Sequence, residues 1–261
     1  MAVDEAILER YADGAGVARA PTLRLYSWAR PTLSLGRGQD ARASFDASHL
    51  RSEGIDLVRR PTGGAAVLHE HERTYAVVGR LREAPFPEGV LDTYRRIAYA
   101  LVAALRHLGL DARATPPRPR EGRVPRSSLC FEEVSSHEIA VGAIKLVGSA
   151  QLRRRGAFLQ HGSILLRANP LRAASVRSSG AGIEDVLGRR VDPRDLDEAL
   201  IRGFAEVFNV EMAPGELSAD EAQSATCLRN AKYRSPEWTL GGPEVAGATP
   251  ALGKAASSGS A

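Results

Sequence analysis

Apolar residues recur along the chain at two spacings, and the changes between them divide the sequence into helical and extended stretches. The pattern predicts helices over residues 3–11, 45–52, 90–108, 195–208 and 218–232. The longest of these, 90–108, carries one apolar stripe and stops at Gly109, so we expect a core helix there. The last one opens with a Ser-Ala-Asp-Glu capping box that begins at Ser218.

Short runs rich in apolar residues, bounded by Gly and Pro, lie between these helices and read as strands. They cover residues 22–28, 32–35, 55–59, 65–68, 74–78, 111–115, 138–141, 145–150 and 157–166. A turn is expected over residues 153–156, where three arginines precede a glycine. The pattern therefore predicts a β-rich core, with helices following it beyond residue 168.

Two segments do not fit a regular element. Residues 116–125 are rich in Pro and Arg and predict a surface loop that leads to Cys130. Residues 241–261 are Gly, Ala, Ser and Pro with almost no large side chains, which predicts a disordered tail. We expect one catalytic domain over residues 1–240.

The composition fits a globular protein of 261 residues, with 43% hydrophobic and 25% charged residues. The net charge of +4 is small, and the arginines alternate with acidic residues instead of forming a block. This distribution does not favour nucleic acid as a partner, but it suits an acidic protein such as an acyl carrier protein. No apolar run approaches the ~18 residues of a membrane span, and no signal peptide is visible, so we expect a cytoplasmic protein without a membrane partner.

Four segments carry residues suited to acyl transfer. They are Arg59-Arg-Pro-Thr-Gly-Gly64, Arg126-Ser-Ser-Leu-Cys-Phe131, Lys145-Leu-Val-Gly-Ser-Ala-Gln151 and Leu159-Gln-His-Gly-Ser163. A thiol, a lysine, a histidine and glycine turns with backbone N–H groups are the parts needed to hold a carbonyl and pass an acyl group between carriers. The sequence therefore indicates an acyltransferase.

Each of these residues also has a plainer interpretation. A lone cysteine such as Cys130 is most often a small buried apolar residue, although nearby arginines favour its thiolate. Lys145 is either an inward-facing base or a lysine on the solvent face of an edge strand, and periodicity alone favours the second. His161 is either a site residue or a core histidine. Cys227 lies within a helical pattern, and neither cysteine belongs to a metal-binding cluster.

Taken in order, the segments resemble the lipoate/biotin protein ligase superfamily, and most closely its cysteine-dependent octanoyltransferases. The matching motifs are Met1-Ala-Val-Asp-Glu-Ala6, the four segments above, Val67-Leu-His69, Ser135 with Glu138, and Lys232-Tyr-Arg-Ser-Pro-Glu-Trp238. Each is weak alone, but the ordered set over residues 1–240 is a strong signal. The resemblance implies an α+β fold of the class II biotin/lipoyl ligase type, with mixed, mostly antiparallel β-sheets flanked by helices.

The resemblance also implies roles for individual residues. Cys130 falls where these transferases carry the acyl group as a thioester, and Lys145 is its catalytic partner. The implied substrate-binding residues are Arg60, Thr62, Gly63, Gly64, His69, Gly148, Ser149, Gln151, His161 and Gly162. We expect Leu68, Val77 and Val147 to line a channel for the acyl chain. No metal or cofactor is implied.

The implied reaction moves an octanoyl group from octanoyl-acyl carrier protein to the lysine of a lipoyl domain, such as that of the glycine cleavage H protein, in lipoate biosynthesis. An ATP-dependent lipoate protein ligase is the alternative, because such ligases share the Arg59 loop and the Lys232 motif. A ligase needs no nucleophile of its own, so Cys130 favours the transferase. A third possibility is a non-catalytic protein that binds lipoyl domains. Two departures from the family pattern suggest it: no strand precedes the first helix, and His137 replaces a usual tyrosine.

Overall fold

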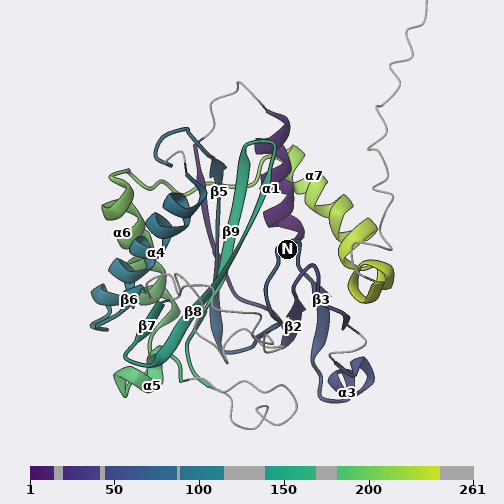
Figure 1. Cartoon of the computed structure of the whole chain (residues 1–261), viewed down its shortest axis with the longest axis horizontal. Coiled ribbons are helices and arrows are strands. Elements are labelled where there is room, and N and C mark those ends of the chain that lie inside the picture. Colours follow the sequence, from purple (N-terminus) through teal and green to yellow (C-terminus); the bar gives the residue numbers. More distant parts are fainter. Residues whose placement is uncertain (15–19, 42–44, 87–88, 115–138, 169–180, 242–261) are drawn as a thin grey trace, which may run out of the picture.

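The computed structural model describes residues 1–14, 20–41, 45–86, 89–114, 139–168 and 181–241, which form two β-sheets flanked by helices (Figure 1). The larger sheet has six strands in the order β1-β5-β9-β8-β7-β6, and every neighbouring pair is antiparallel. Its strands are β1 (Thr22–Tyr26), β5 (Glu72–Arg80), β6 (Arg113–Ala114), β7 (Ile139–Val141), β8 (Ile144–Arg154) and β9 (Ala157–Leu165). The α+β class and the mostly antiparallel pairing are confirmed.

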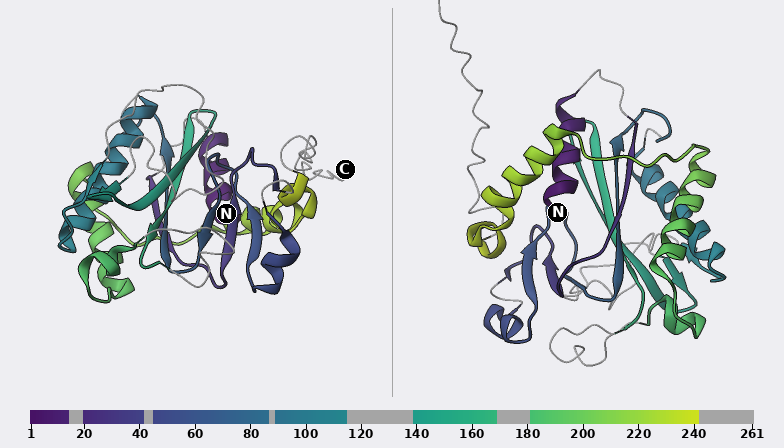
Figure 2. Two further views of the ribbon diagram at one scale, coloured as in Figure 1. Left: turned by 60° about the horizontal axis from the view of Figure 1, so that its bottom comes forward. Right: turned by 180° about the vertical axis from the view of Figure 1, so that it is seen from behind.

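The smaller sheet has three strands in the order β3-β2-β4 and lies beside one end of the larger sheet (Figure 1, Figure 2). Its strands are β2 (Thr32–Leu35), β3 (Asp56–Arg59) and β4 (Val67–His69), with β2 parallel to β3 and antiparallel to β4. Helix α3 (Ala47–Ser52) packs Leu50 against this sheet. The parallel β2–β3 pair makes the arrangement of strands mixed, as the resemblance implied.

Helices cover both faces of the larger sheet because successive strand residues point to opposite sides. Tyr75 and Val77 of β5 pack in the main core with α4 (Val90–His107) and α6 (Pro193–Phe208). Ala76 and Val78 face the other way, against Ile7 of α1 and its neighbours. Helix α1 spans Ala2–Asp13, and α7 (Ala219–Leu228) lies alongside it (Figure 2).

The structure confirms the predicted helices, with two differences. The helix expected over 218–232 has the predicted capping box at Ser218, but it ends at Leu228 and continues as π-helical turns, η1 (Arg229–Tyr233) and η2 (Glu237–Gly241). The short helix α5 (Ile183–Leu187) was not predicted, since it has little more than one turn of apolar pattern.

Strand β8 runs to Arg154, past the predicted end at residue 150. The reversal into β9 occurs at Arg155 and Gly156, which both have positive φ, within the turn expected at 153–156. Arg154 belongs to the strand because it pairs with Ala157 of β9, and its side chain forms ion pairs with Glu9 and Glu5 of α1. These tertiary partners are invisible in the local sequence pattern.

Several predictions fall outside the described residues. Cys130, the 116–125 loop, and residues 242–261 of the expected tail belong to this group. Among the helices that the structure describes, none is long and apolar enough to span a membrane. Within the same residues, no group of His, Cys, Asp and Glu side chains is arranged to hold a metal ion.

Candidate active site

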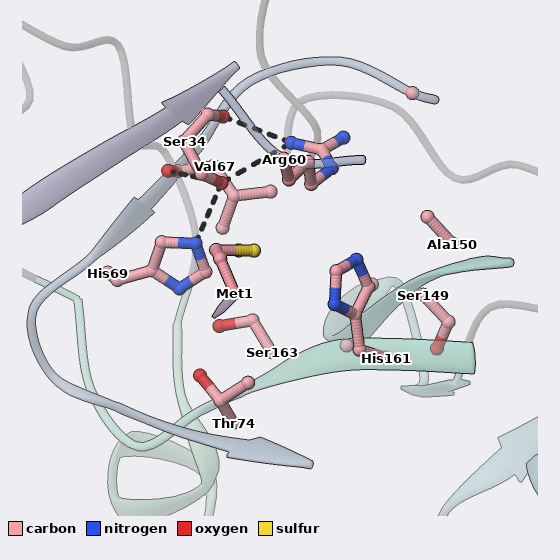
Figure 3. Close-up of a pocket in the computed structure, with 13 residues that line it drawn as sticks. Met1, Ser34, Arg60, Val67, His69, Thr74, Ser149, Ala150, His161 and Ser163 are labelled. Atoms are coloured by element: carbon pink, nitrogen blue, oxygen red, sulfur yellow. Dashed lines mark hydrogen bonds between the residues drawn. The ribbon is translucent and has the colours of Figure 1, made fainter. Parts of the chain in front are cut away.

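A small cavity that opens to solvent lies between the two sheets (Figure 3). The smaller sheet and its turn contribute one wall, and β5, β8 and β9 contribute the other. The lining consists of Met1, Ser34, Arg60, Gly64, Val67, His69, Thr74, Gly148, Ser149, Ala150, His161, Gly162 and Ser163. Three segments that the sequence singled out separately, those around residues 60–64, 148–151 and 160–163, thus meet in one place.

Most of the expected substrate-binding residues line this cavity, namely Arg60, Gly64, His69, Gly148, Ser149, His161 and Gly162. The other three do not line the cavity but contact residues of the same segments. Thr62 contacts His161, Gly63 accepts from Arg60 through its carbonyl, and the Gln151 amide donates to Gln160 Oε1 at 3.1 Å.

Arg60 organises the glycine turn from inside. Its Nη2 donates to the carbonyl oxygens of Gly63 at 2.8 Å and Ala65 at 2.7 Å, and Nη1 donates to the Ser34 carbonyl at 3.0 Å. The remaining nitrogen, Nε, donates to Thr62 Oγ1 at 3.2 Å. A guanidinium whose three nitrogens all have protein acceptors holds backbone in place, so Arg60 positions the turn.

The turn also depends on a close backbone contact. A Cβ on Gly36, at the end of β2, would lie 1.8 Å from the Gly64 carbonyl oxygen, so only glycine fits there. Gly64 itself has φ of +98°, which L side chains rarely adopt. The sequence indicated a glycine turn, but it gave no signal that Gly36 is its partner.

His161 belongs to a buried polar array that α1 completes. Its Nε2 lies 2.6 Å from Thr62 Oγ1, and its Nδ1 lies 3.8 Å from Asp4 Oδ2. Asp4 also accepts from Arg24 Nη1 and from the Tyr26 hydroxyl, both at 2.7 Å. Burial lowers the pKa of the His161 imidazole, although the Asp4 carboxylate opposes that shift. The imidazole therefore favours its neutral form, which can accept or pass a proton.

A second buried array surrounds His69, and most of its members were missed in the sequence. His69 Nε2 lies 2.8 Å from Ser34 Oγ, Nδ1 lies 3.3 Å from Glu72 Oε1, and the ring stacks on Trp28 at 4.2 Å. Glu72 also accepts from the hydroxyls of Thr74, at 2.6 Å, and of Ser163. The polar run that contains Glu72 resembles a loop, although this glutamate is the first residue of β5 and is buried.

Gly162 lines the cavity, as expected of a substrate-binding residue, and the packing around it requires glycine. A Cβ there would lie 2.5 Å from the Gly148 carbonyl oxygen and 2.6 Å from Tyr75 Cε1. The missing side chain therefore makes room for Tyr75, whose hydroxyl lies 2.7 Å from Ser149 Oγ. Burial raises the pKa of Tyr75 to about 12, so its hydroxyl stays a donor at neutral pH.

Lys145 is buried on β8, with 5% of its surface exposed. Strand β8 is an interior strand, between β9 and β7, so the alternative of a solvent-facing lysine on an edge strand is wrong (Figure 1). Lys145 does not line the cavity, and it precedes Gly148 of the lining by three residues. Because Cys130 lies outside the described residues, the relation between the thiol and this lysine stays a prediction.

The expectation for the residues of an acyl channel does not hold at this cavity. Val77 and Val147 pack in the main core, with 3% and 1% exposure, and Leu68 packs against the small sheet. None of the three lines the cavity, which is lined by Val67 instead. Because β-strand residues alternate sides, a shift of one position separates Leu68 from Val67.

Comparison with known proteins places this geometry in a family. The model of the lipoyl protein ligase A/B catalytic domain matches residues 1–205. The chain is 43% identical to octanoyltransferase LipM of Kyrpidia tusciae, over 91% of this chain and 92% of that protein. It is 39% identical to octanoyltransferase LipM of Moorella thermoacetica, with the same coverage.

Solved structures show the same fold. A lipoate-protein ligase A bound with ATP superposes with a TM-score of 0.76 at 30% identity, covering 92% of each chain. A bipartite lipoate protein ligase of Thermoplasma acidophilum, studied with its E2 lipoyl domain, gives 0.72 at 27% identity, covering 92% of this chain and 90% of that one. The chain belongs to the lipoyl protein ligase A/B catalytic domain family and is similar to its LipM octanoyltransferases.

Proposed function

We propose that the protein transfers an octanoyl group from octanoyl-acyl carrier protein to the lysine of a lipoyl domain, such as that of the glycine cleavage H protein. A thioester on Cys130 is the intermediate. The observation that carries the proposal is the cavity, where the glycine turn, His161 and Gly148 meet in a chain 43% identical to an octanoyltransferase.

In the first half-reaction, the Cys130 sulfur attacks the thioester carbonyl of the donor. A carbon–sulfur bond to Cys130 forms and the bond to the carrier sulfur breaks, so the carrier leaves as a thiol. The proton lost by Cys130 is the one that the carrier sulfur gains. Lys145 is our candidate to relay it, because a buried amine on the strand that leads to Gly148 is shielded from water.

In the second half-reaction, the neutral amine of the acceptor lysine attacks the acyl-enzyme. An amide bond forms, the thioester bond to Cys130 breaks, and the amine proton returns to the sulfur. The exchange of a thioester for an amide is downhill, so neither half-reaction needs a nucleotide.

Backbone N–H groups of the glycine turn can donate hydrogen bonds to the carbonyl oxygen of the substrate and stabilise the negative charge that develops on it. The Gly63 and Ala65 carbonyls point at Arg60, so the N–H groups of the same planar peptides, on Gly64 and Ala66, point away from it. Within the described part of the chain, no hydrogen bond uses the Gly64 N–H, and Gly64 lines the cavity. This N–H is our candidate oxyanion donor.

The alternative function is an ATP-dependent lipoate ligase, which the likeness to a ligase solved with ATP keeps open. One assay separates the possibilities. Purified protein is mixed with octanoyl-acyl carrier protein and apo H protein, or with lipoate, ATP and apo H protein, and modification of the H protein is measured by mass spectrometry. Transfer from the carrier without ATP supports the proposal. Modification only with ATP identifies a ligase, and no modification in either mixture leaves a non-catalytic binder.

The intermediate has its own test. Incubation with octanoyl-carrier alone should add the mass of one octanoyl group to the protein, and Cys130→Ser should abolish the thioester. Cys227→Ser serves as the matched control, because Cys227 is exposed on α7, and that variant should still be acylated. An adduct that persists in Cys130→Ser would remove Cys130 from the mechanism.

A further inference from the structure

A continuous chain of polar contacts runs from Arg60 at the glycine turn to Trp28 on the far side of His69, and Figure 3 shows its part from Arg60 through Ser34 to His69. It joins the smaller sheet to the larger one along the cavity wall. In order, the chain passes through Arg60, Ser34, His69, Glu72, Thr74 and Trp28, and Ser163 joins it at Glu72. The described mechanism uses only Arg60 and its turn, so the rest of the array needs an explanation.

The direction of most hydrogen bonds in the array follows from its ends. Arginine and the indole of tryptophan only donate, and a carboxylate only accepts. Arg60 Nη1 donates to Ser34 Oγ at 3.3 Å, and the Ser34 proton has two acceptors, His69 Nε2 at 2.8 Å and the Val67 carbonyl at 3.5 Å. From the other end, Trp28 Nε1 donates to Thr74 Oγ1 at 2.9 Å, and Thr74 donates to Glu72 at 2.6 Å.

The position of Glu72 selects between the two neutral forms of His69. A proton on Nε2 would leave the Nδ1 lone pair facing the Glu72 carboxylate at 3.3 Å, whereas a proton on Nδ1 faces that charge favourably and lets Nε2 accept from Ser34. Nδ1 is buried and completes no hydrogen bond within the part of the chain that the structure describes, so Glu72 acts on it as a carboxylate 3.3 Å away; the His69 side chain is 6% exposed. The Trp28 ring fixes the imidazole plane by stacking at an angle of 18°.

We propose that Glu72 is a positioning residue for acyl transfer, holding His69 in the Nδ1–H tautomer so that Ser34 and Arg60 keep the glycine turn in its catalytic shape. This inference rests on the proposed function for the turn. The carboxylate acts through three residues and touches no substrate. It resembles the carboxylates that orient metal-binding histidines, where their loss typically reduces metal affinity or activity 10- to 100-fold.

The test is Glu72→Gln, with Glu198→Gln as control. Glutamine keeps the shape of the side chain but has one acceptor oxygen and an NH₂ donor. It therefore cannot accept from Thr74 and Ser163 and also present a negative charge to His69. We expect His69 to shift toward the Nε2–H tautomer in a long-range ¹H–¹⁵N spectrum. We also expect kcat for octanoyl transfer from octanoyl-carrier to fall about tenfold, with KM for the carrier unchanged. Glu198 is exposed on α6, and its variant should change neither quantity.

A second variant tests the same array at Ser34 and leaves the Glu72 carboxylate in place. Ser34→Ala should reduce kcat by a similar factor while His69 keeps its Nδ1 proton, because Glu72 is still present. The double variant should lose about as much activity as the more damaging single variant and no more, since both residues act through one chain. Multiplying losses in the double variant would overturn the proposal.

Two further results would overturn the proposal: an unchanged His69 tautomer in Glu72→Gln, or a changed tautomer with an unchanged kcat. The tautomer is read without any substrate. If the unmodified protein transfers no octanoyl group, the proposed function fails, and the spectrum still decides whether Glu72 sets the state of His69.

Discussion

Arg59 and Trp238 lie 179 residues apart in the sequence and exchange hydrogen bonds through side chain and backbone. Arg59 Nε donates to the Trp238 carbonyl at 3.0 Å, and Trp238 Nε1 donates to the Arg59 carbonyl at 2.9 Å. This exchange ties the end of the described chain to the strand that enters the glycine turn. Because Arg60, the residue after Arg59, lines the cavity, the C-terminal motif stabilises the cavity wall.

The first prediction concerns the Arg59 guanidinium, which is fully buried. It also donates to the carbonyls of Gly36, Arg37 and Gln39, at 2.7 to 3.0 Å. Lysine cannot reproduce this fork, so Arg59→Lys should lower the free energy of unfolding by about 3 kcal/mol in a urea titration. Arg51→Lys, at an exposed position of α3, should change it by less than about 0.5 kcal/mol. Equal stability of the two variants would contradict this account.

A second prediction concerns Glu5 of α1, which receives the C-terminal segment. Its carboxylate accepts from Lys232 Nζ at 2.7 and 2.8 Å and from the Tyr233 hydroxyl at 2.6 Å, and it is 1% exposed. Glu5→Gln removes the charge facing a half-buried ammonium and should cost about 2 kcal/mol. Amide hydrogen exchange over residues 229–241 should accelerate. The control is Glu9→Gln, which removes the charge from the more exposed ion pair with Arg154. In this variant, amide hydrogen exchange over residues 229–241 should be unchanged.

Sequence patterns predicted the elements of this fold better than its site. The stripe over 90–108 and the runs around residues 32–35 and 157–166 are local patterns, and the structure confirms them. Glycine turns and His161 were also recognisable, because few residue types suit those positions. Local periodicity could not show that α1 places Asp4 behind His161, since that contact spans the whole domain.

Glu72 illustrates why the rest of the site was missed. Charged residues in a polar run indicate solvent exposure, and only the pairing of β5 with β9 brings Ser163 opposite Thr74, beside this carboxylate. The same limit explains Val67, which lines the cavity although its neighbour Leu68 was expected there. Strand register decides such cases, and tertiary pairing sets the register.

A third prediction follows from the contact between Gly162 and Tyr75. Gly162→Ala would place a methyl group 2.5 Å from the Gly148 carbonyl oxygen, a backbone atom in the middle of the sheet. We expect a loss of about 2 kcal/mol in unfolding free energy, because neither β8 nor Tyr75 can withdraw without losing packing. Gly215→Ala should have little effect in the same titration, since nothing lies within 4 Å of its added carbon. A neutral Gly162→Ala would show that the sheet opens there easily.

The fourth prediction is a pH dependence of stability. Burial lowers the pKa of His161 in the folded protein, so the unfolded chain binds that proton more readily. The free energy of unfolding should therefore fall as pH drops through the unfolded value of about 6.5, by at most about 1.4 kcal/mol per pH unit. The fall due to His161 should stop once the folded pKa is reached. Urea titrations between pH 5 and 8 should show a smaller slope for His161→Gln, and identical slopes would refute the assignment.

The last prediction concerns Lys145, whose burial on an interior strand is compatible with a role in proton transfer. Lys145→Met keeps the length of the side chain and suits a buried site, so the fold should persist while the amine is lost. We expect acylation of Cys130 by octanoyl-carrier to slow by a factor of about 100 or more, the usual range for a general base. Stopped-flow mass detection of the acyl-enzyme provides the rate. Lys145→Arg separates charge from proton transfer, because guanidinium stays protonated and should restore little of the rate. Recovery of full activity in Lys145→Arg would mean that the positive charge alone suffices, and the proton would then need another path to the carrier sulfur.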